Sequence, residues 1–590
     1  MKKAALAPLA LILGMTACMG KDSGRSPATT PAEAPAPIAA AEVQPEPAPV
    51  PPPPPPASYP VATMKAARIA GVEGGVVGGV MGGVAGGTAG GRIGVTQSSN
   101  VAYRYAAAPA ADDEHNTEEY GRFEENPFLR PADNPLSTFS IDVDRASYAN
   151  VRRFLDTGQR PPRQAVRIEE MVNYFTYDYP DPAGGPFSIT TELAACPWNN
   201  RHKLMLIGLQ GKRMRTRDLP PNNLVFLIDS SGSMQSPDKL PLVKAGLRLL
   251  VDQLRPDDRV AIVTYAGSAG LVLPSTSGAN KGAIMSAIEQ LDAGGSTAGA
   301  EGIVLAYDVA KKNFLREGNN RVILATDGDF NVGVSSDGEL EQLIERKRRD
   351  GVFLTVLGFG TGNIKDSKME LLADKGNGNY AYVDSLFEAR KTLVHEMGAT
   401  LFAIAKDVKI QVEFNPARVG AYRLLGYENR MLRSEDFNDD QKDAGELGAG
   451  HSVTSLYEII PPGAEIPAGS VDPLKYQKPA ASAAREGSNE LATVKLRYKE
   501  PDGDTSKLLS RVVHDSPGVM MSDNFRLAAS VAQLGMLLRD SPHKAAASYE
   551  SVLELARSVR SDDPEGYRRD LLSMVAKAER LPSPKEVAEK

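Results

Sequence analysis

Runs of apolar residues alternate with amphipathic stretches through the middle of the chain. Leu224–Ile228 is wholly hydrophobic, as expected of a strand that a parallel sheet buries on both faces. Leucines then recur at near-helical spacing at 242, 247, 250 and 254. Further strands are predicted at 259–266, 321–326, 352–358 and 380–383, and helices at 239–254, 281–291, 298–315, 337–349 and 386–405. Repeated strand–helix units predict an α/β fold with a doubly wound, mostly parallel sheet, which binds ligands at the carboxyl ends of its strands.

The segments on either side of this region have a different pattern. Residues 187–210 hold two strand-like runs, and period-two alternation recurs at 408–414, 453–460, 491–498 and 508–513, which is typical of an antiparallel sheet with one wet face. We therefore expect a β-sandwich that flanks the α/β domain or into which that domain is inserted. Short amphipathic helices are predicted at 147–155 and 166–175, and three helical stretches between 522 and 581 form a C-terminal cap or, alternatively, a partner-binding groove.

The first residues have the pattern of a targeting signal. Lys2 and Lys3 precede the apolar stretch Ala4–Met15, which matches a secretory signal and is too short to span a membrane as a helix. The stretch ends in Met15-Thr16-Ala17-Cys18 and resembles the bacterial lipobox, although the family prefers Leu where Met15 stands. The resemblance implies lipidation of Cys18 in the cell envelope, and Met19 in place of Asp favours the outer membrane. The alternative is an ordinary cleavable signal peptide.

Most of the excess of proline and glycine over an ordinary composition lies before residue 100. Pro51–Pro56 is a run of consecutive prolines, which favours a stiff polyproline II spacer. In residues 71–91 a Gly-Gly pair recurs every four residues. This repeat favours a flexible linker, with a membrane-associating or self-associating glycine zipper as the alternative. We predict a disordered tether over 19–125, whose last part, Asp112–Glu125, is mildly acidic.

Charge and cysteine content exclude two classes of protein. A net charge of −7 argues against nucleic-acid binding, which usually shows a basic surface. Two cysteines cannot form a disulfide framework. Cys196 is expected to be a packed free thiol.

Three loops at predicted strand ends carry oxygen ligands. They are Asp229-Ser230-Ser231-Gly232-Ser233, Gly294-Gly295-Ser296-Thr297 and Thr326-Asp327-Gly328-Asp329. Hydroxyls and carboxylates without His or Cys suit a hard cation such as Mg²⁺. Parallel strands deliver such loops to one edge of the sheet, so the three loops can share one site. The alternative is that these residues only cap helices and form turns.

In this order and spacing, the loops resemble the metal-ion-dependent adhesion site of von Willebrand factor type A domains. The resemblance implies five ligands to a divalent cation, most often Mg²⁺, with Mn²⁺ or Ca²⁺ as alternatives: Asp229, Ser231, Ser233, Thr297 and Asp327. In that family the cation keeps an open position, which a carboxylate of a partner protein fills. An unidentified envelope or surface protein is therefore the expected partner.

The flanks are similar to bacterial envelope proteins of the YfbK-like type, on motifs such as Phe139–Asp144 and Pro197-Trp198-Asn199. The expected organisation is a signal peptide (1–18), a tether (19–125), a segment associated with the type A domain (126–215), the type A domain (220–405), a β-rich domain (406–515) and a helical C-terminal region (516–590).

No catalytic residues are assigned. The six histidines are scattered and form no His-Glu-x-x-His motif, no Gly-x-Ser-x-Gly elbow occurs, and His395-Glu396 is expected to be a surface or packing pair. We therefore expect a lipid-anchored envelope protein that binds a partner through a cation rather than an enzyme. The alternatives are a metal-dependent hydrolase or a regulatory subunit of an envelope enzyme complex, and a purely structural role without metal binding.

Overall fold

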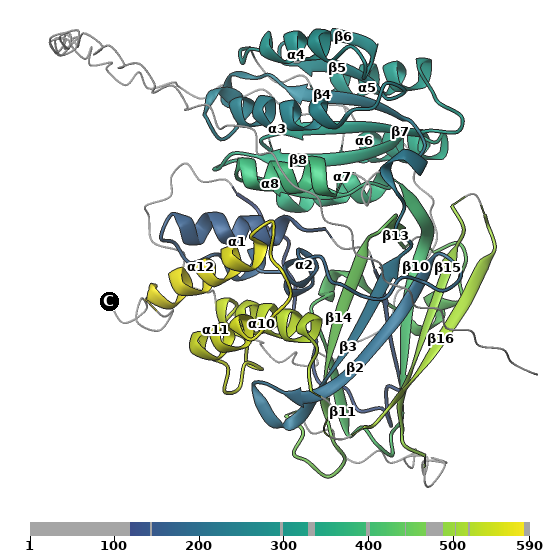
Figure 1. Cartoon of the computed structure of the whole chain (residues 1–590), viewed down its shortest axis with the longest axis vertical. Helices are drawn as coiled ribbons and strands as arrows, with labels where there is room; N and C mark the ends of the chain where they lie inside the picture. The colour runs from purple at the N-terminus through teal and green to yellow at the C-terminus, as the bar shows by residue number, and fades with distance from the viewer. Residues whose placement is uncertain are drawn as a thin grey trace, which may run out of the picture. The chain divides into compact units, whose positions relative to one another are not determined.

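A parallel sheet lies at the centre of the chain. The structure, a computed structural model, describes residues 118–582 except 142–143, 296–298, 329–336, 397–401, 443, 468–487, 502, 517 and 519. Within these residues the central sheet has the strand order β6-β5-β4-β7-β8-β9 (Figure 1). Its strands are β4 (Asn222–Asp229), β5 (Arg259–Tyr265), β6 (Ala269–Ser277), β7 (Asn319–Thr326), β8 (Phe353–Phe359) and β9 (Tyr380–Val383). All neighbouring pairs are parallel except β5 and β6.

Helices cover both faces of this sheet. One hydrophobic core joins the sheet to α3 (Leu240–Gln253), α4 (Lys281–Glu289) and α8 (Leu386–Arg390). The core on the other face includes α5 (Gly299–Lys312), α6 (Asp337–Arg349) and α7 (Asp366–Lys375). Strands β4 and β7 are buried along their whole length, which explains why their sequences are continuous apolar runs. The predicted doubly wound α/β fold is confirmed.

Two antiparallel sheets share a second core. One has the order β12-β1-β10-β15-β16, with β13 also paired to β10, and the other has the order β11-β14-β3-β2. Side chains of both sheets, among them Val412 and Ile207, belong to the same hydrophobic cluster. The strands are β1 (Leu136–Ser140), β2 (Phe187–Cys196), β3 (Asn199–Gly211), β10 (Ala403–Phe414), β11 (Ala421–Leu425), β12 (Met431–Leu432), β13 (Gly445–Gly448), β14 (Ser452–Ile460), β15 (Glu490–Lys499) and β16 (Ser506–His514).

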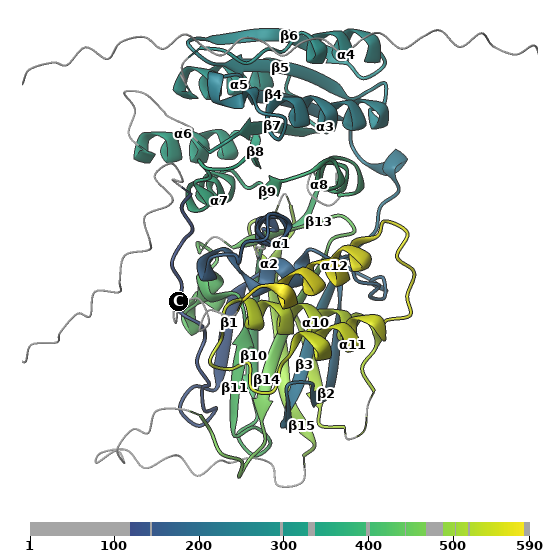
Figure 2. The same ribbon diagram turned by 90° about the vertical axis from the view of Figure 1, so that its left-hand side faces the viewer.

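Strand β3 is buried on both faces. Met205, Ile207 and Leu209 face the core between the two sheets, whereas Leu204 and Leu206 face a helical layer. That layer contains α1 (Ala146–Asp156), α2 (Ile168–Asn173), α10 (Asp523–Leu538), α11 (Tyr549–Arg557) and α12 (Tyr567–Arg580). Figure 2 shows α10, α11 and α12 against strands β14, β3 and β2. The C-terminal helices therefore cap the outer face of this sheet.

The central domain interrupts this flanking body. Strand β3 precedes it and β14 follows it, yet the two pair over eight residues on each strand, from Lys203↔Ile459 to Gln210↔Ser452. The chain leaves at Gly211 and returns near Ile404, and a Cβ atom at Gly211 would lie 3.0 Å from Ile404 Cδ1. Exit and return are therefore side by side, as an insertion requires.

Several boundaries differ from the expected ones. The helix expected over 386–405 ends earlier: α8 continues as a π-helical turn, η4 (Lys391–His395), and Ala403 already begins β10. Ala405, Val408 and Ile410 are buried in the flanking core, and the strand shifts register between Lys406 and Lys409. Strand β6 and helix α7 were not predicted. The tether was expected to run to 125, but Glu119 already forms a parallel bridge with Lys365.

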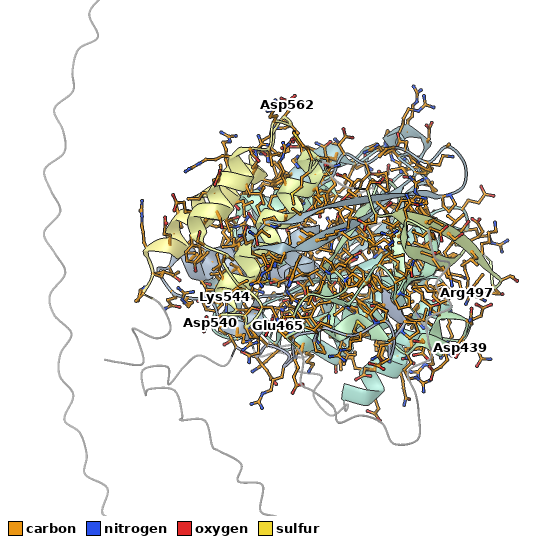
Figure 3. All side chains as sticks on the ribbon, turned by 90° about the horizontal axis from the view of Figure 1, so that it is seen from below. Asp439, Glu465, Arg497, Asp540, Lys544 and Asp562 are labelled. Atoms are coloured by element: carbon orange, nitrogen blue, oxygen red, sulfur yellow. The ribbon has the colours of Figure 1, made fainter. Side chains whose placement is uncertain are left out.

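Buried arginines join the central domain to the flanking body. Arg152 of α1 lies 2.5 Å from Asp384 and 2.7 Å from Glu388 in the central domain, and its side chain is only 5% exposed. Arg167 pairs with Asp366 and Glu370 of α7, and Arg430 pairs with Glu370 and Asp374. Other ion pairs lie at the surface and join solvent-exposed side chains, such as Asp540 with Lys544 after α10 (Figure 3). Exposed pairs contribute little, whereas breaking a buried pair leaves a charge without compensation.

We predict that Arg152→Met destabilises the chain by about 3–5 kcal/mol, because it leaves the buried Asp384 and Glu388 carboxylates without their cation. Urea denaturation followed by circular dichroism measures the change. Arg248→Met is the matched control, since both side chains of its ion pair with Glu289 are exposed to solvent, and it should cost less than about 1 kcal/mol. Equal losses in the two variants would contradict the prediction.

A buried carboxyl at the same contact makes stability depend on pH. Burial, followed by the charge of Glu428, raises the pKa of Glu169 to about 7. Its Oε2 has no hydrogen-bond partner in the described part of the chain. Because the folded state holds this proton more tightly than the unfolded state, its contribution is complete below about pH 4.5 and is lost as pH rises through about 7.

Glu169→Gln removes this titration and keeps the size of the side chain. From pH 5 to pH 8 the wild type loses the contribution of the bound proton, whereas the variant has no such proton to lose. We therefore expect the free energy of unfolding of the variant, minus that of the wild type, to increase by up to about 3 kcal/mol over this range. Denaturation at both pH values tests this, with the exposed Glu554 changed to Gln as control. A constant difference between variant and wild type across this range would show that Glu169 does not titrate there.

Candidate metal site

Asp229 ends strand β4 and begins the first of the three loops. Its side chain is buried, and Oδ1 accepts a hydrogen bond from the Ser231 backbone N–H at 2.9 Å. Oδ2 accepts from the Tyr265 hydroxyl at 3.1 Å and from the Thr326 hydroxyl at 3.4 Å. Burial raises the pKa of Asp229, and the charge of Asp327 adds to this effect while the Ser231 hydrogen bonds oppose it.

The two serines of this loop place their hydroxyls together. Ser231 Oγ and Ser233 Oγ are 3.0 Å apart, with Ser231 buried and Ser233 exposed to solvent. The Gly232 N–H donates to Gly295 O at 3.1 Å, and the Gly294 N–H donates to Ser230 O at 2.7 Å. These bonds hold the first loop against the second. Thr297, the ligand expected from the second loop, lies outside the described residues.

Asp327 follows β7, the parallel neighbour of β4. Its side chain is fully buried, and Oδ2 accepts a hydrogen bond from Lys239 Nζ at 2.8 Å. The next residue, Gly328, has φ +104°, and a Cβ there would lie 2.4 Å from Asn363 O. Glycine is therefore required for the Asp327 loop to pack against the loop after β8. The structure thus brings Asp229, Ser231, Ser233 and Asp327 to one edge of the sheet.

The donor set fits a hard divalent cation. Two buried carboxylates lie at neighbouring strand ends beside two hydroxyls, and the described hydrogen bonds to Asp229 all come from neutral donors. Oxygen ligands of these two kinds suit Mg²⁺, Mn²⁺ or Ca²⁺. Across the described residues, no three His, Cys, Asp or Glu side chains gather in a way that could hold a metal ion. Such a site therefore depends on the serine hydroxyls together with the two aspartates.

Sequence reasoning missed three residues at this site. Tyr265 supports Asp229, Lys239 supports Asp327, and Gly360 leaves room for the lysine side chain. The sequence position of Lys239 could have indicated an acidic partner, because this lysine immediately precedes helix α3. A helix N-terminus favours negative charge, so a lysine at that position calls for a compensating anion.

The other residues singled out in the sequence are packed elsewhere. Cys196 is a buried free thiol, and burial raises its pKa. His202 Nδ1 lies 2.6 Å from Glu458 Oε1, and His395 Nδ1 lies 2.8 Å from the Tyr567 hydroxyl. Glu396 pairs with Lys391 and Arg145. Cys18 and the 71–91 repeat lie outside the described residues, and no helix among those described is long and apolar enough to cross a membrane.

Comparison with known proteins extends these observations. Residues 223–396 match the family described as von Willebrand factor type A domain, residues 114–206 match one described as von Willebrand factor, and residues 399–581 match one described as uncharacterized protein YfbK, C-terminal. The chain is 44% identical over 471 residues to the uncharacterized protein YfbK of Escherichia coli (strain K12). The matched region covers 78% of this chain and 81% of that protein.

Two further similarities have lower identity. Inter-alpha-trypsin inhibitor heavy chain H4 of Bos taurus is 29% identical over 150 residues, covering 24% of this chain and 16% of that protein. A solved structure of von Willebrand factor type A from Catenulispora acidiphila aligns with a TM-score of 0.35 and 14% identity, over 78% of this chain and 91% of that one. From the identity and coverage with the Escherichia coli protein, together with the matched domains, the chain belongs to the YfbK family of proteins that carry a von Willebrand factor type A domain.

Proposed function

We propose that the chain binds a partner protein through a divalent cation held at the edge of its central sheet. Asp229, Ser231, Ser233, Thr297 and Asp327 are the proposed ligands, and a carboxylate of the partner completes the coordination. One observation carries the proposal: the two aspartates and the two serines converge at this edge, with the carboxylates buried and Ser233 open to solvent. Lys239 compensates only one of these two buried negative charges, and burying the other is unfavourable unless a further cation compensates it.

The solvent-facing side of the site suits a binding role. Ser233 and Gly232 are exposed, whereas Asp229 and Asp327 lie beneath them. The buried carboxylates would hold a cation, and an oxygen ligand of an incoming protein would reach it from the exposed side of the loop. In this arrangement the bound cation supplies a Lewis-acidic contact for an oxygen ligand, and the chain's own residues hold it in position.

The proposal includes the location of the protein. The basic start, the apolar stretch and Cys18 support export and lipid attachment. We propose a lipoprotein of the cell envelope, most consistent with the outer membrane because Met19 follows the cysteine. The partner is then another protein of the envelope or the cell surface.

The metal site is tested with Asp229→Ala in the purified full chain. We expect calorimetric titration with Mg²⁺ or Mn²⁺ to show binding by the wild type and none by the variant, because the variant lacks one of the two buried carboxylates. Circular dichroism checks that the fold is retained. Asp238→Ala is the control, since that carboxyl lies nearby but accepts its hydrogen bond from Ser236.

Partner binding is tested by affinity capture from an envelope extract. Proteins retained by the wild type in Mg²⁺ should be released by a chelator and should not be retained by the Asp229→Ala variant. Capture that is the same with chelator and with the variant would contradict a cation-dependent role. Turnover of a substrate that disappears in the variant would instead support a metal-dependent hydrolase.

Lipid attachment is tested with Cys18→Ser. We expect the wild type in the membrane fraction and the variant in the soluble envelope fraction, because the variant has no thiol to acylate. An acyl chain contributes about 0.8 kcal/mol for each buried CH₂ group, so its loss should release most of the protein. Retention of the variant in the membrane fraction would contradict an anchor at Cys18.

A further inference from the structure

Lys239 places an ammonium group directly on one of the two carboxylates of the site. Its Nζ lies 2.8 Å from Asp327 Oδ2, and the two side chains are 9% and 0% exposed. Lys239 immediately precedes helix α3, where the helix dipole disfavours a cation. The pairing with Asp327 compensates this cost, so the lysine is held here by the carboxylate rather than by its helix.

The fold leaves a slot for the stem of this lysine. Gly360, just after β8, has φ +77°, and a Cβ there would lie 2.3 Å from Lys239 Cε and 2.5 Å from Cγ. The Gly360 carbonyl accepts a hydrogen bond from the Tyr382 hydroxyl at 2.7 Å, which fixes the backbone at this point. Any larger residue at 360 would displace the lysine. The contact between Lys239 and Asp327 is therefore built from three separate parts of the chain.

The formal charges show what this lysine does. Asp229 and Asp327 carry two negative charges, and Lys239 offsets one of them. A divalent cation added to the three groups leaves a single positive charge at the site, which a partner's carboxylate then neutralises. Without the lysine the metal-loaded site would be neutral before the partner arrives and negative afterwards.

We propose that Lys239 is a built-in counter-cation of this site, which lowers its affinity for divalent cations and leaves the metal-loaded site positive toward an anionic ligand. This inference rests on the proposed function, because it assumes that a cation binds at Asp229 and Asp327. In the absence of metal, the lysine stabilises the fold by compensating Asp327. In the presence of metal, its charge repels the cation at short range, which is a strong effect where water is excluded.

The test compares Lys239→Met, which keeps the stem and removes the charge, with Lys239→Arg, which keeps the charge. Calorimetric titration of the full chain with Mn²⁺ and with Mg²⁺ measures the dissociation constant of each cation. We expect Lys239→Met to bind on the order of tenfold more tightly, or more, than the wild type. Lys239→Arg should remain close to the wild type. Lys244→Met is the matched control, because Lys244 lies on helix α3 and, within the described residues, donates to the backbone carbonyls of Glu289 and Leu291 rather than to a carboxylate.

Thermal unfolding gives a second measurement. Metal-free Lys239→Met should melt below the wild type, because Asp327 loses its counter-charge, and added Mn²⁺ should raise its melting temperature more than it raises that of the wild type. If metal-free Lys239→Met does not fold, the variant is prepared with Mn²⁺ and the release of the ion into excess chelator is timed. Release slower than from the wild type supports the inference.

These measurements distinguish a failure of the proposed metal site from a failure of the role proposed for Lys239. If the wild type binds neither cation, the proposed function itself fails. If the wild type binds and Lys239→Met binds equally or more weakly, with release that is no slower, the counter-cation role of Lys239 is overturned while the metal site stands. The same tightening in Lys244→Met would also overturn it, because a general loss of positive charge would then explain the effect.

Discussion

The pairing of β3 with β14 is the constraint on which the arrangement of the described chain depends. The two strands lie on opposite sides of the central domain in sequence, yet they are hydrogen-bonded neighbours in one sheet. The chain must therefore leave and re-enter the flanking body at one place, as the proximity of Gly211 and Ile404 shows. The exit leads to Asn222, the first residue of β4. Because β4 then runs away from the connection, Asp229 lies at the opposite end of the strand, at the edge of the sheet where the candidate site is located.

Buried ion pairs supplement these two covalent connections. Within the central domain, the carboxylates that Arg152, Arg167 and Arg430 contact lie on or beside α7 and α8. The edge strand β9 is covered as well, since the Tyr380 N–H donates to Asp144 at 2.8 Å. Paired buried charges have strict geometric requirements, so they fix the orientation of the domain more than they add to its stability. The contact that orients the domain therefore involves the β8 and β9 side of the central sheet, beyond β4 and β7 in the strand order.

The sequence was most informative where a single local pattern decides the structure. The apolar run Leu224–Ile228 predicted a doubly buried strand, and the loops after β4 and β7 bring Asp229, Ser231, Ser233 and Asp327 together. Strand β6 escaped prediction because it is an edge strand, half exposed and interrupted by Pro274. The Ala403 end of β10 escaped because its partners come from distant strands. The pair of Arg152 and Glu388 spans 236 positions, so no local spacing could reveal it.

The first described residues contact the loop that borders the candidate site. Glu118 accepts hydrogen bonds from Arg153 and from the Gly362 N–H, and the backbone of Glu119 pairs with Ile364 and Asp366. The same loop, through Asn363, packs against Gly328 next to Asp327. The loop after β8 is thus shared between the N-terminal connection on one side and the candidate ligand loop on the other. Arg153 holds Glu118 by two hydrogen bonds of 2.9 Å, so the first described residues are fixed to the folded body at the loop that borders the candidate site.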